Sequence, residues 1–151
     1  MYRQPSRTFI DFFFNDKLKL NKLLFYSDFV NYKQFGYSIT GLSYRAIDYG
    51  PVPSCYDNIF TYFENENIFK SKWIKDSNGS AKETFITELE FDESLFSNDE
   101  KQVLGKIIET FKDTSSWDMV DLSHKEQCWN DLNLEREIIN YQLCAFSLVG
   151  V

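Results

Sequence analysis

Histidine is nearly missing from this chain of 151 residues, because His124 is its only one. A general acid–base scheme or a Ser–His–Asp triad would therefore have to use His124. Asp121 and Ser123 lie close by in the sequence, but we interpret Ser123 as a helix N-cap with His124 in the first helical turn. The sequence has no nucleophile elbow, P-loop or dinucleotide-binding glycine pattern. We therefore expect no enzymatic activity and no cofactor.

Cysteine is scarce as well: Cys55, Cys128 and Cys144 are an odd number without a CxxC pair. The sequence therefore predicts no disulfide framework and, by default, a cytoplasmic location. His124 and Cys128 lie four residues apart, which leaves a metal site on one helical face open as an alternative. Structural zinc sites normally have paired ligands at two ends of a clamp. We favour Cys128 as a small buried apolar side chain and expect no metal.

Long apolar runs and basic clusters are also lacking. No run approaches the roughly 20 residues of a transmembrane helix, and the first residues have no signal-peptide core, so we expect no membrane partner. The 16 basic residues stand against 23 acidic ones, which gives a formal net charge of −7. Duplex binding needs Lys and Arg to neutralise phosphates, so we expect no direct nucleic-acid binding by this chain. An acidic surface instead suits a basic protein partner.

Aromatic residues, in contrast, are abundant. Phe, Trp and Tyr make up 18% of the chain, and 43% of all residues are hydrophobic. This composition predicts one compact domain spanning residues 1–151. The 15 Phe, 3 Trp and 9 Tyr residues are more than one core of this size should need, so we expect some of them to lie exposed together as an interaction surface.

The hydrophobic pattern predicts a mainly α-helical α+β fold. We expect a short helix in the apolar segment 8–14 and a central helix over residues 17–34, which Gly36 ends. We expect a last helix over residues 134–151. Three capping boxes predict further successive helices, formed by Ser97 with Glu100, Ser115 with Asp118, and Ser123 with Glu126.

Two regions carry strand signals. Residues 43–49 predict a short strand that stops at Pro51 and Pro53, because proline donates no ladder hydrogen bond, and Pro53 suits the first turn of a helix that ends near residue 67. Asn-Gly at residues 78–79, within the segment 70–91, predicts a hairpin with a two-residue type I′ turn. This hairpin would pack on helices or join the 43–49 strand in a small antiparallel sheet.

Two blocks of the sequence together resemble a known family. The first block contains KLLFYSDF at residues 22–29, ITG at 39–41 and YGPVPS at 49–54. The second block is WDMVDLSH at residues 117–124, followed by Trp129. In order and spacing they are similar to the Panacea domain, also called the SocA-like antitoxin domain, which is related to the phage-associated GepA proteins. The resemblance covers roughly residues 18–129.

The resemblance implies a domain that binds a cognate toxin protein and neutralises it, in some relatives by delivering it to a protease. The leading alternative is a transcription-regulator or proteolysis-adaptor module. Many relatives carry a helix-turn-helix module before this domain, entered through a segment similar to YRQPS. Here Met1 stands directly before that segment, so we expect the helix-turn-helix to be absent.

The candidate partner-binding residues come from the family-like positions and from aromatic side chains beside the 50–53 turn. The family-like positions are Tyr49, Gly50, Pro51, Val52, Pro53, His124 and Trp129. The alternative for each is a structural role in the turn or the core. The candidate aromatic anchors are Tyr49, Tyr56 and Tyr62, with Asp57 next to them, because prolines nearby fix the backbone and reduce the entropy lost on binding.

Overall fold

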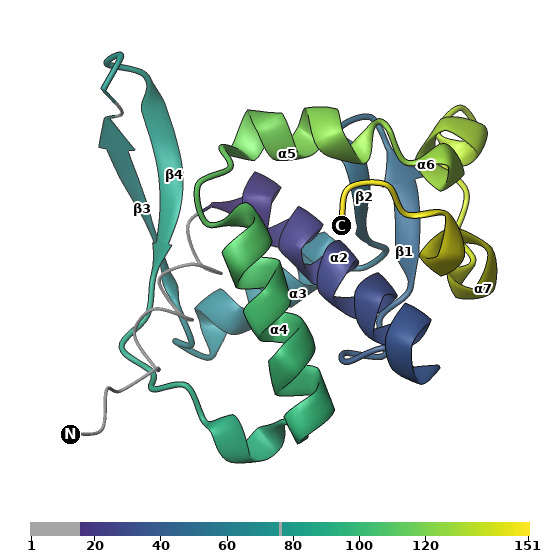
Figure 1. Cartoon of the computed structure of the whole chain (residues 1–151). Coiled ribbons are helices and arrows are strands. Elements are labelled where there is room, and N and C mark those ends of the chain that lie inside the picture. The colour runs from purple at the N-terminus through teal and green to yellow at the C-terminus, as the bar shows by residue number, and fades with distance from the viewer. Residues whose placement is uncertain (1–15, 76) are drawn as a thin grey trace.

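The computed structural model describes residues 16–75 and 77–151, which form six α-helices, two 3₁₀ turns and two antiparallel sheets of two strands each (Figure 1). The α-helices are α2 (Lys17–Phe35), α3 (Tyr56–Asn65), α4 (Asn98–Phe111), α5 (Ser116–Ser123), α6 (Gln127–Leu132) and α7 (Tyr141–Cys144). The strands are β1 (Tyr44–Ile47), β2 (Gly50–Pro53), β3 (Lys70–Lys75) and β4 (Ala81–Ile86), and the 3₁₀ turns are η1 (Glu93–Leu95) and η2 (Ala145–Ser147). The predicted mainly helical α+β class is confirmed. The helix predicted over residues 8–14 lies outside the described residues.

Helix α2 is the centre of the fold, as its wide apolar surface predicts. It contacts β2, α4, α5, α7 and η2, which surround it on several sides (Figure 1). Its large side chains Phe25, Tyr26 and Phe29 have no exposed surface. The helix begins after Asp16, whose carboxylate accepts a hydrogen bond from the Lys19 N–H at 2.8 Å. It ends at Gly36 with φ = 83°, the left-handed conformation expected of a glycine in this position.

The predicted strand over residues 43–49 is β1, which ends at Ile47, before the prolines. Pro51 and Pro53 lie in a second strand, β2, which the sequence did not predict. Pro51 pairs with Ala46, and Pro53 pairs with Tyr44. Alternate residues of an antiparallel pair direct their backbone groups away from the partner strand, and two prolines spaced by two residues can both do so on an edge strand. Helix α3 accordingly begins at Tyr56 rather than at Pro53, and ends at Asn65.

Strands β3 and β4 form the predicted hairpin, but with a longer loop than predicted. The last pair is Lys75 with Ala81, so five residues separate the strands and the two-residue type I′ turn was wrong. Gly79 has a positive φ of 81°. The hairpin is a sheet of its own that extends away from the helices, and its base packs on α3 through stacked Phe85 and Phe60 rings 5.6 Å apart (Figure 1).

The three predicted capping boxes have different outcomes. Ser97 and Glu100 form a complete box at the start of α4, and the Ser115 hydroxyl accepts a hydrogen bond from the Asp118 N–H at 3.1 Å at the start of α5. The third box was wrong, because Ser123 is the last residue of α5 and donates its hydroxyl hydrogen bond to the Val120 carbonyl at 2.8 Å. His124 therefore caps the C-terminus of α5 instead of opening a helix.

The last 18 residues also differ from the prediction of one continuous helix. Ile138 forms a β-bridge with Arg45 on β1, and only α7 and η2 are helical beyond it. Cys144, at the end of α7, is bonded to Cys128 on α6, so the prediction of no disulfide was wrong. The chain folds α7 back onto α6, a contact that cysteine spacing alone does not reveal. No helix among the described residues is long and apolar enough to cross a membrane.

Candidate protein-binding surface

The two sequence blocks, which lie far apart in the chain, meet around Gly50. The Lys22 ammonium group on α2 is fully buried and donates a hydrogen bond to the Pro51 carbonyl at 3.0 Å. A Cβ at Gly50 would lie 2.2 Å from the Ser123 hydroxyl oxygen and 2.7 Å from Cε of Lys22. Helices α2 and α5 therefore approach β2 so closely that only glycine fits there. Burial lowers the pKa of Lys22 to about 7.

A second buried contact ties the loop after α2 to the same helix. The Asp28 carboxylate accepts hydrogen bonds from the Thr40 N–H at 2.9 Å and from the Tyr44 hydroxyl at 2.6 Å. Burial raises the pKa of Asp28, an effect that the hydrogen bonds from Thr40 and Tyr44 oppose. Together with the hydrogen bond from Lys22 to Pro51, these contacts fix all three segments of the first block, and Tyr44 of β1, against one another.

Glu126 joins the second block to the end of the described chain. Its carboxylate has no exposed surface and accepts a hydrogen bond from the Tyr26 hydroxyl at 3.0 Å. The same carboxylate accepts hydrogen bonds from the backbone N–H groups of Val149 at 3.1 Å and Gly150 at 2.9 Å. The sequence suggested only a capping role for Glu126, and no local signal shows that the distant residues 149–150 would need an acceptor.

His124 and Trp129 contact the backbone of the β1–β2 turn. The Trp129 indole N–H donates a hydrogen bond to the Ile47 carbonyl at 2.6 Å, and His124 Nε2 lies 3.1 Å from the Asp48 carbonyl oxygen. The two rings stack with their centroids 3.9 Å apart. Both side chains therefore contact this turn, which agrees with the alternative that they have a structural role. The Ser123 hydroxyl donates its hydrogen bond to the Val120 carbonyl and not to His124.

The surface of this turn carries an exposed aromatic pair. Tyr49 is 56% exposed, and its ring lies 5.7 Å from that of Trp117, which is 61% exposed, in an edge-to-face arrangement. We did not select Trp117 from the sequence, although it lies in the second block. The helical period of α5 contained the signal, because it buries Met119 and Val120 and leaves Trp117 on another face.

The other candidate residues lie in two different environments. The backbone and side chains of strand β2 are buried, which includes Gly50, Pro51, Val52 and Pro53. On α3, Tyr56 is half-buried against the apolar cluster around Phe60, whereas Asp57 is exposed and Tyr62 is 57% exposed beside Phe63. Among the described residues, no ring contact joins Tyr49 to Tyr56 or Tyr62. A partner-binding role for these positions stays a prediction.

The metal alternative depended on the thiol of Cys128. That sulfur is bonded to Cys144, and the parts of the chain that the structure describes contain no group of three or more His, Cys, Asp or Glu side chains that could hold a metal ion.

Comparison with known proteins relates these contacts to a family. A family model described as antitoxin SocA-like, Panacea domain, matches residues 20–130. No curated protein and no solved structure matches the chain. The matched range includes α2 from Leu20 onward, the β1–β2 turn, α5 and Trp129. It therefore contains the contacts around Gly50 and those of His124 and Trp129 with the turn. The chain therefore belongs to the SocA-like antitoxin family and contains its Panacea domain.

Proposed function

We propose that this chain neutralises a cognate toxin protein by binding it directly, without enzymatic turnover. Membership of an antitoxin family supports the toxin as partner. The observation that carries direct binding is the exposed pair of Tyr49 and Trp117. Tyrosine and tryptophan are the residues most enriched among those that dominate binding energy at protein interfaces.

The support behind Tyr49 makes this pair suitable as an anchor. His124 and Trp129 hold the carbonyls of Asp48 and Ile47, and Arg136 pairs with the Asp48 carboxylate at 3.2 Å. A turn held at three points loses little conformational entropy when a partner binds. The exposed acids Asp118 and Asp121 on α5, together with the net charge of −7, favour a basic toxin surface.

Co-expression with the toxin tests this proposal. We expect the double variant Tyr49→Ala, Trp117→Ala to lose rescue of cells that express the toxin gene next to this one, while circular dichroism shows an unchanged fold. The matched control is Tyr37→Ala, Trp73→Ala, which removes a 42% exposed tyrosine and a 67% exposed tryptophan elsewhere and should rescue like the parent. Full rescue by the first variant would contradict the proposed interface and make Tyr56→Ala with Asp57→Ala the next variant to test.

The mode of neutralisation has its own readout. Direct binding predicts a stable complex from which the toxin is recovered with unchanged mass, and an unchanged amount of toxin in the cell. A falling amount of toxin would indicate delivery to a protease instead. We propose that the complex forms in the cytoplasm, because an antitoxin must meet its toxin where the toxin is made. The Cys128–Cys144 bond removes the separate argument from unpaired cysteines.

A further inference from the structure

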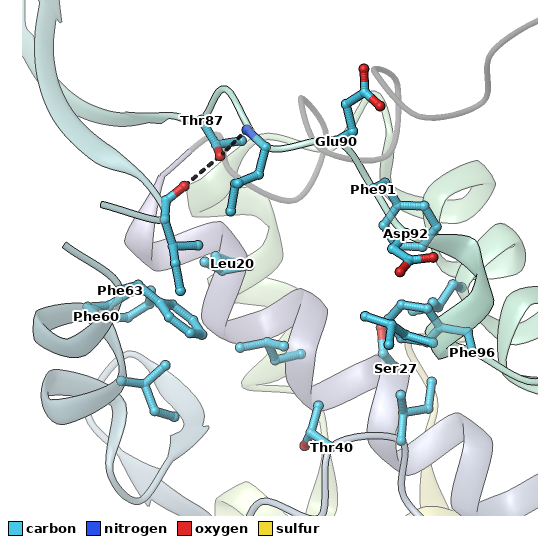
Figure 2. Close-up of a pocket in the computed structure, with 17 residues that line it drawn as sticks. Leu20, Ser27, Thr40, Phe60, Phe63, Thr87, Glu90, Phe91, Asp92 and Phe96 are labelled. Carbon is cyan, nitrogen blue, oxygen red and sulfur yellow. Dashed lines mark hydrogen bonds between the residues drawn. The ribbon is translucent and has the colours of Figure 1, made fainter. Parts of the chain in front are cut away.

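A separate groove of about 370 Å³ lies between α2, α3, the segment 87–96 and α4. Figure 2 shows Phe60 and Phe63 on one side of this groove, Phe91 and Phe96 on the other, and Leu20 of α2 between them. The lining is almost entirely apolar, and its volume is in the range of sites that bind ligands or anchoring side chains.

One buried side-chain atom in the groove has no hydrogen-bond partner among the described residues. Ser27 lines the groove from α2, only 3% of it is exposed, and its hydroxyl oxygen makes no hydrogen bond within residues 16–75 and 77–151 (Figure 2). A buried hydroxyl without a hydrogen bond is destabilising. A bound group that carries a hydrogen-bond donor would therefore gain affinity from Ser27 beyond that of apolar contact.

The rim of the groove is acidic. Within the segment 87–96, Glu88, Glu90, Asp92 and Glu93 are all exposed, and the segment contains no Lys or Arg. In the same segment, Leu89 is 54% and Leu95 is 76% exposed. An apolar floor with a rim of one charge favours a partner that combines an apolar anchor with the opposite charge.

We propose that this groove receives a tryptophan or tyrosine side chain from a segment of the toxin that carries Lys or Arg on either side. The aromatic ring fills the apolar groove, its N–H or O–H reaches the Ser27 hydroxyl, and the basic residues face Glu90 and Asp92. This inference rests on the proposed function, and it adds a second contact region to the one at Tyr49 and Trp117.

Fluorescence anisotropy with a labelled synthetic peptide tests the chemistry of the groove. The probe is a short peptide with one Trp between Leu and Lys residues, compared with the same peptide carrying Glu in place of Lys. We expect the full chain to bind the Lys peptide about tenfold more tightly or better. Equal affinity for the two peptides, or no binding of either, overturns the inference.

Two substitutions locate the binding site. Glu88→Lys with Glu90→Lys, both exposed in the acidic segment 87–96, should weaken binding of the Lys peptide about tenfold. The control Asp131→Lys with Glu135→Lys makes the same charge change at exposed positions outside the groove and should have a much smaller effect. If both variants weaken peptide binding equally, the attraction is general and electrostatic, and the groove is not the binding site.

The Ser27 hydroxyl has a more specific readout. Ser27→Ala should weaken binding of the Trp peptide but not of a matched peptide with Phe in place of Trp. Only the indole N–H can donate a hydrogen bond to the Ser27 hydroxyl. The same variant should raise the melting temperature of the free chain, since it removes an unpaired buried group. Equal effects on the two peptides would overturn the predicted hydrogen bond.

The co-expression assay separates this inference from the proposed function. If the parent rescues cells from the toxin and the rim variant rescues them equally well, the groove is not a toxin site and the proposed function stands. If the parent itself does not rescue cells, the proposed function fails, and the toxin as occupant fails with it. Rescue by the parent that the rim variant loses supports both.

Discussion

Lys22 is a single residue whose burial makes stability depend on pH. The fold removes its ammonium group from water, and within residues 16–75 and 77–151 this group donates one hydrogen bond, to the Pro51 carbonyl. Burial lowers the pKa to about 7, whereas a lysine in the unfolded chain keeps its proton up to a pH of about 10.4. Between these values the unfolded chain binds more protons than the folded one, so the free energy of unfolding should rise with pH.

We expect denaturant unfolding to show this rise between pH 7 and pH 9, by at most about 1.4 kcal/mol per pH unit. Lys22→Met should remove the rise, because methionine fills similar space without a titrating group. Lys33→Met, on the exposed part of α2, should keep it. A rise that persists unchanged in Lys22→Met would show that another group causes it.

Asp28 is the second residue with a testable buried contact. Asp28→Ala should lower the free energy of unfolding by about 2–3 kcal/mol, since it leaves the Tyr44 hydroxyl and the Thr40 N–H without their acceptor. Asp28→Asn keeps one acceptor oxygen, so it should lower the free energy of unfolding by less than Asp28→Ala does. Asp121→Ala, at an exposed position on α5, should change stability by less than about 0.5 kcal/mol. Equal losses for Asp28→Ala and Asp28→Asn would contradict the hydrogen-bond explanation.

At the scale of elements, the sequence predicts what short-range patterns determine. Helix α2 and the capped start of α4 follow from apolar periodicity and from Ser97 with Glu100, so both were found at nearly the right bounds. Strand β2 was missed because the cost of a proline depends on which side of the strand faces a partner, and this is fixed only in the folded chain. Ser123 followed by Glu126 fits the start of a helix and also its end, so only the packing of α5 distinguishes them.

The β3–β4 loop allows a test with two glycines of opposite expected effect. Gly79 has a φ of 81°, so Gly79→Val should lower the free energy of unfolding by about 1–2 kcal/mol, although the space around it is open. Gly105 lies inside α4, also with open space, so Gly105→Ala should raise stability by roughly 0.5–1 kcal/mol. An unchanged denaturation midpoint in Gly79→Val would contradict the ordered loop.

At the scale of the whole molecule, the candidate site could be predicted only in part. The sequence identified Tyr49, His124 and Trp129 but not their roles, since the last two face the backbone of a turn about 80 residues earlier in the chain. Trp117 was missed because its neighbour Tyr49 comes from another segment. The sequence shows that Ser27 carries a polar hydroxyl. Only the fold shows that this hydroxyl is buried without a hydrogen-bond partner among the described residues.

The disulfide between Cys128 and Cys144 is a long-range contact that the cysteine pattern of the sequence did not predict. Cys128 and Cys144 close a loop with a sequence separation of 16, so we expect Cys128→Ser with Cys144→Ser to lower the free energy of unfolding by about 3 kcal/mol. Reductant should lower the free energy of unfolding of the parent by the same amount and leave that of the double variant unchanged. Cys55→Ser is the control, because Cys55 is exposed and free. Insensitivity of the parent to reductant would show that the bond contributes nothing to stability.

The tight contact at Gly50 also limits how this sequence can vary over evolutionary time. A side chain at position 50 would overlap Ser123 and Lys22, and the φ of 99° is unfavourable for any residue except glycine. Shortening Ser123 would remove one obstacle and leave the other, so no single compensating substitution opens position 50 to change. Among related sequences we therefore expect glycine here even where the exposed Tyr49 beside it, at the proposed interface, has been exchanged.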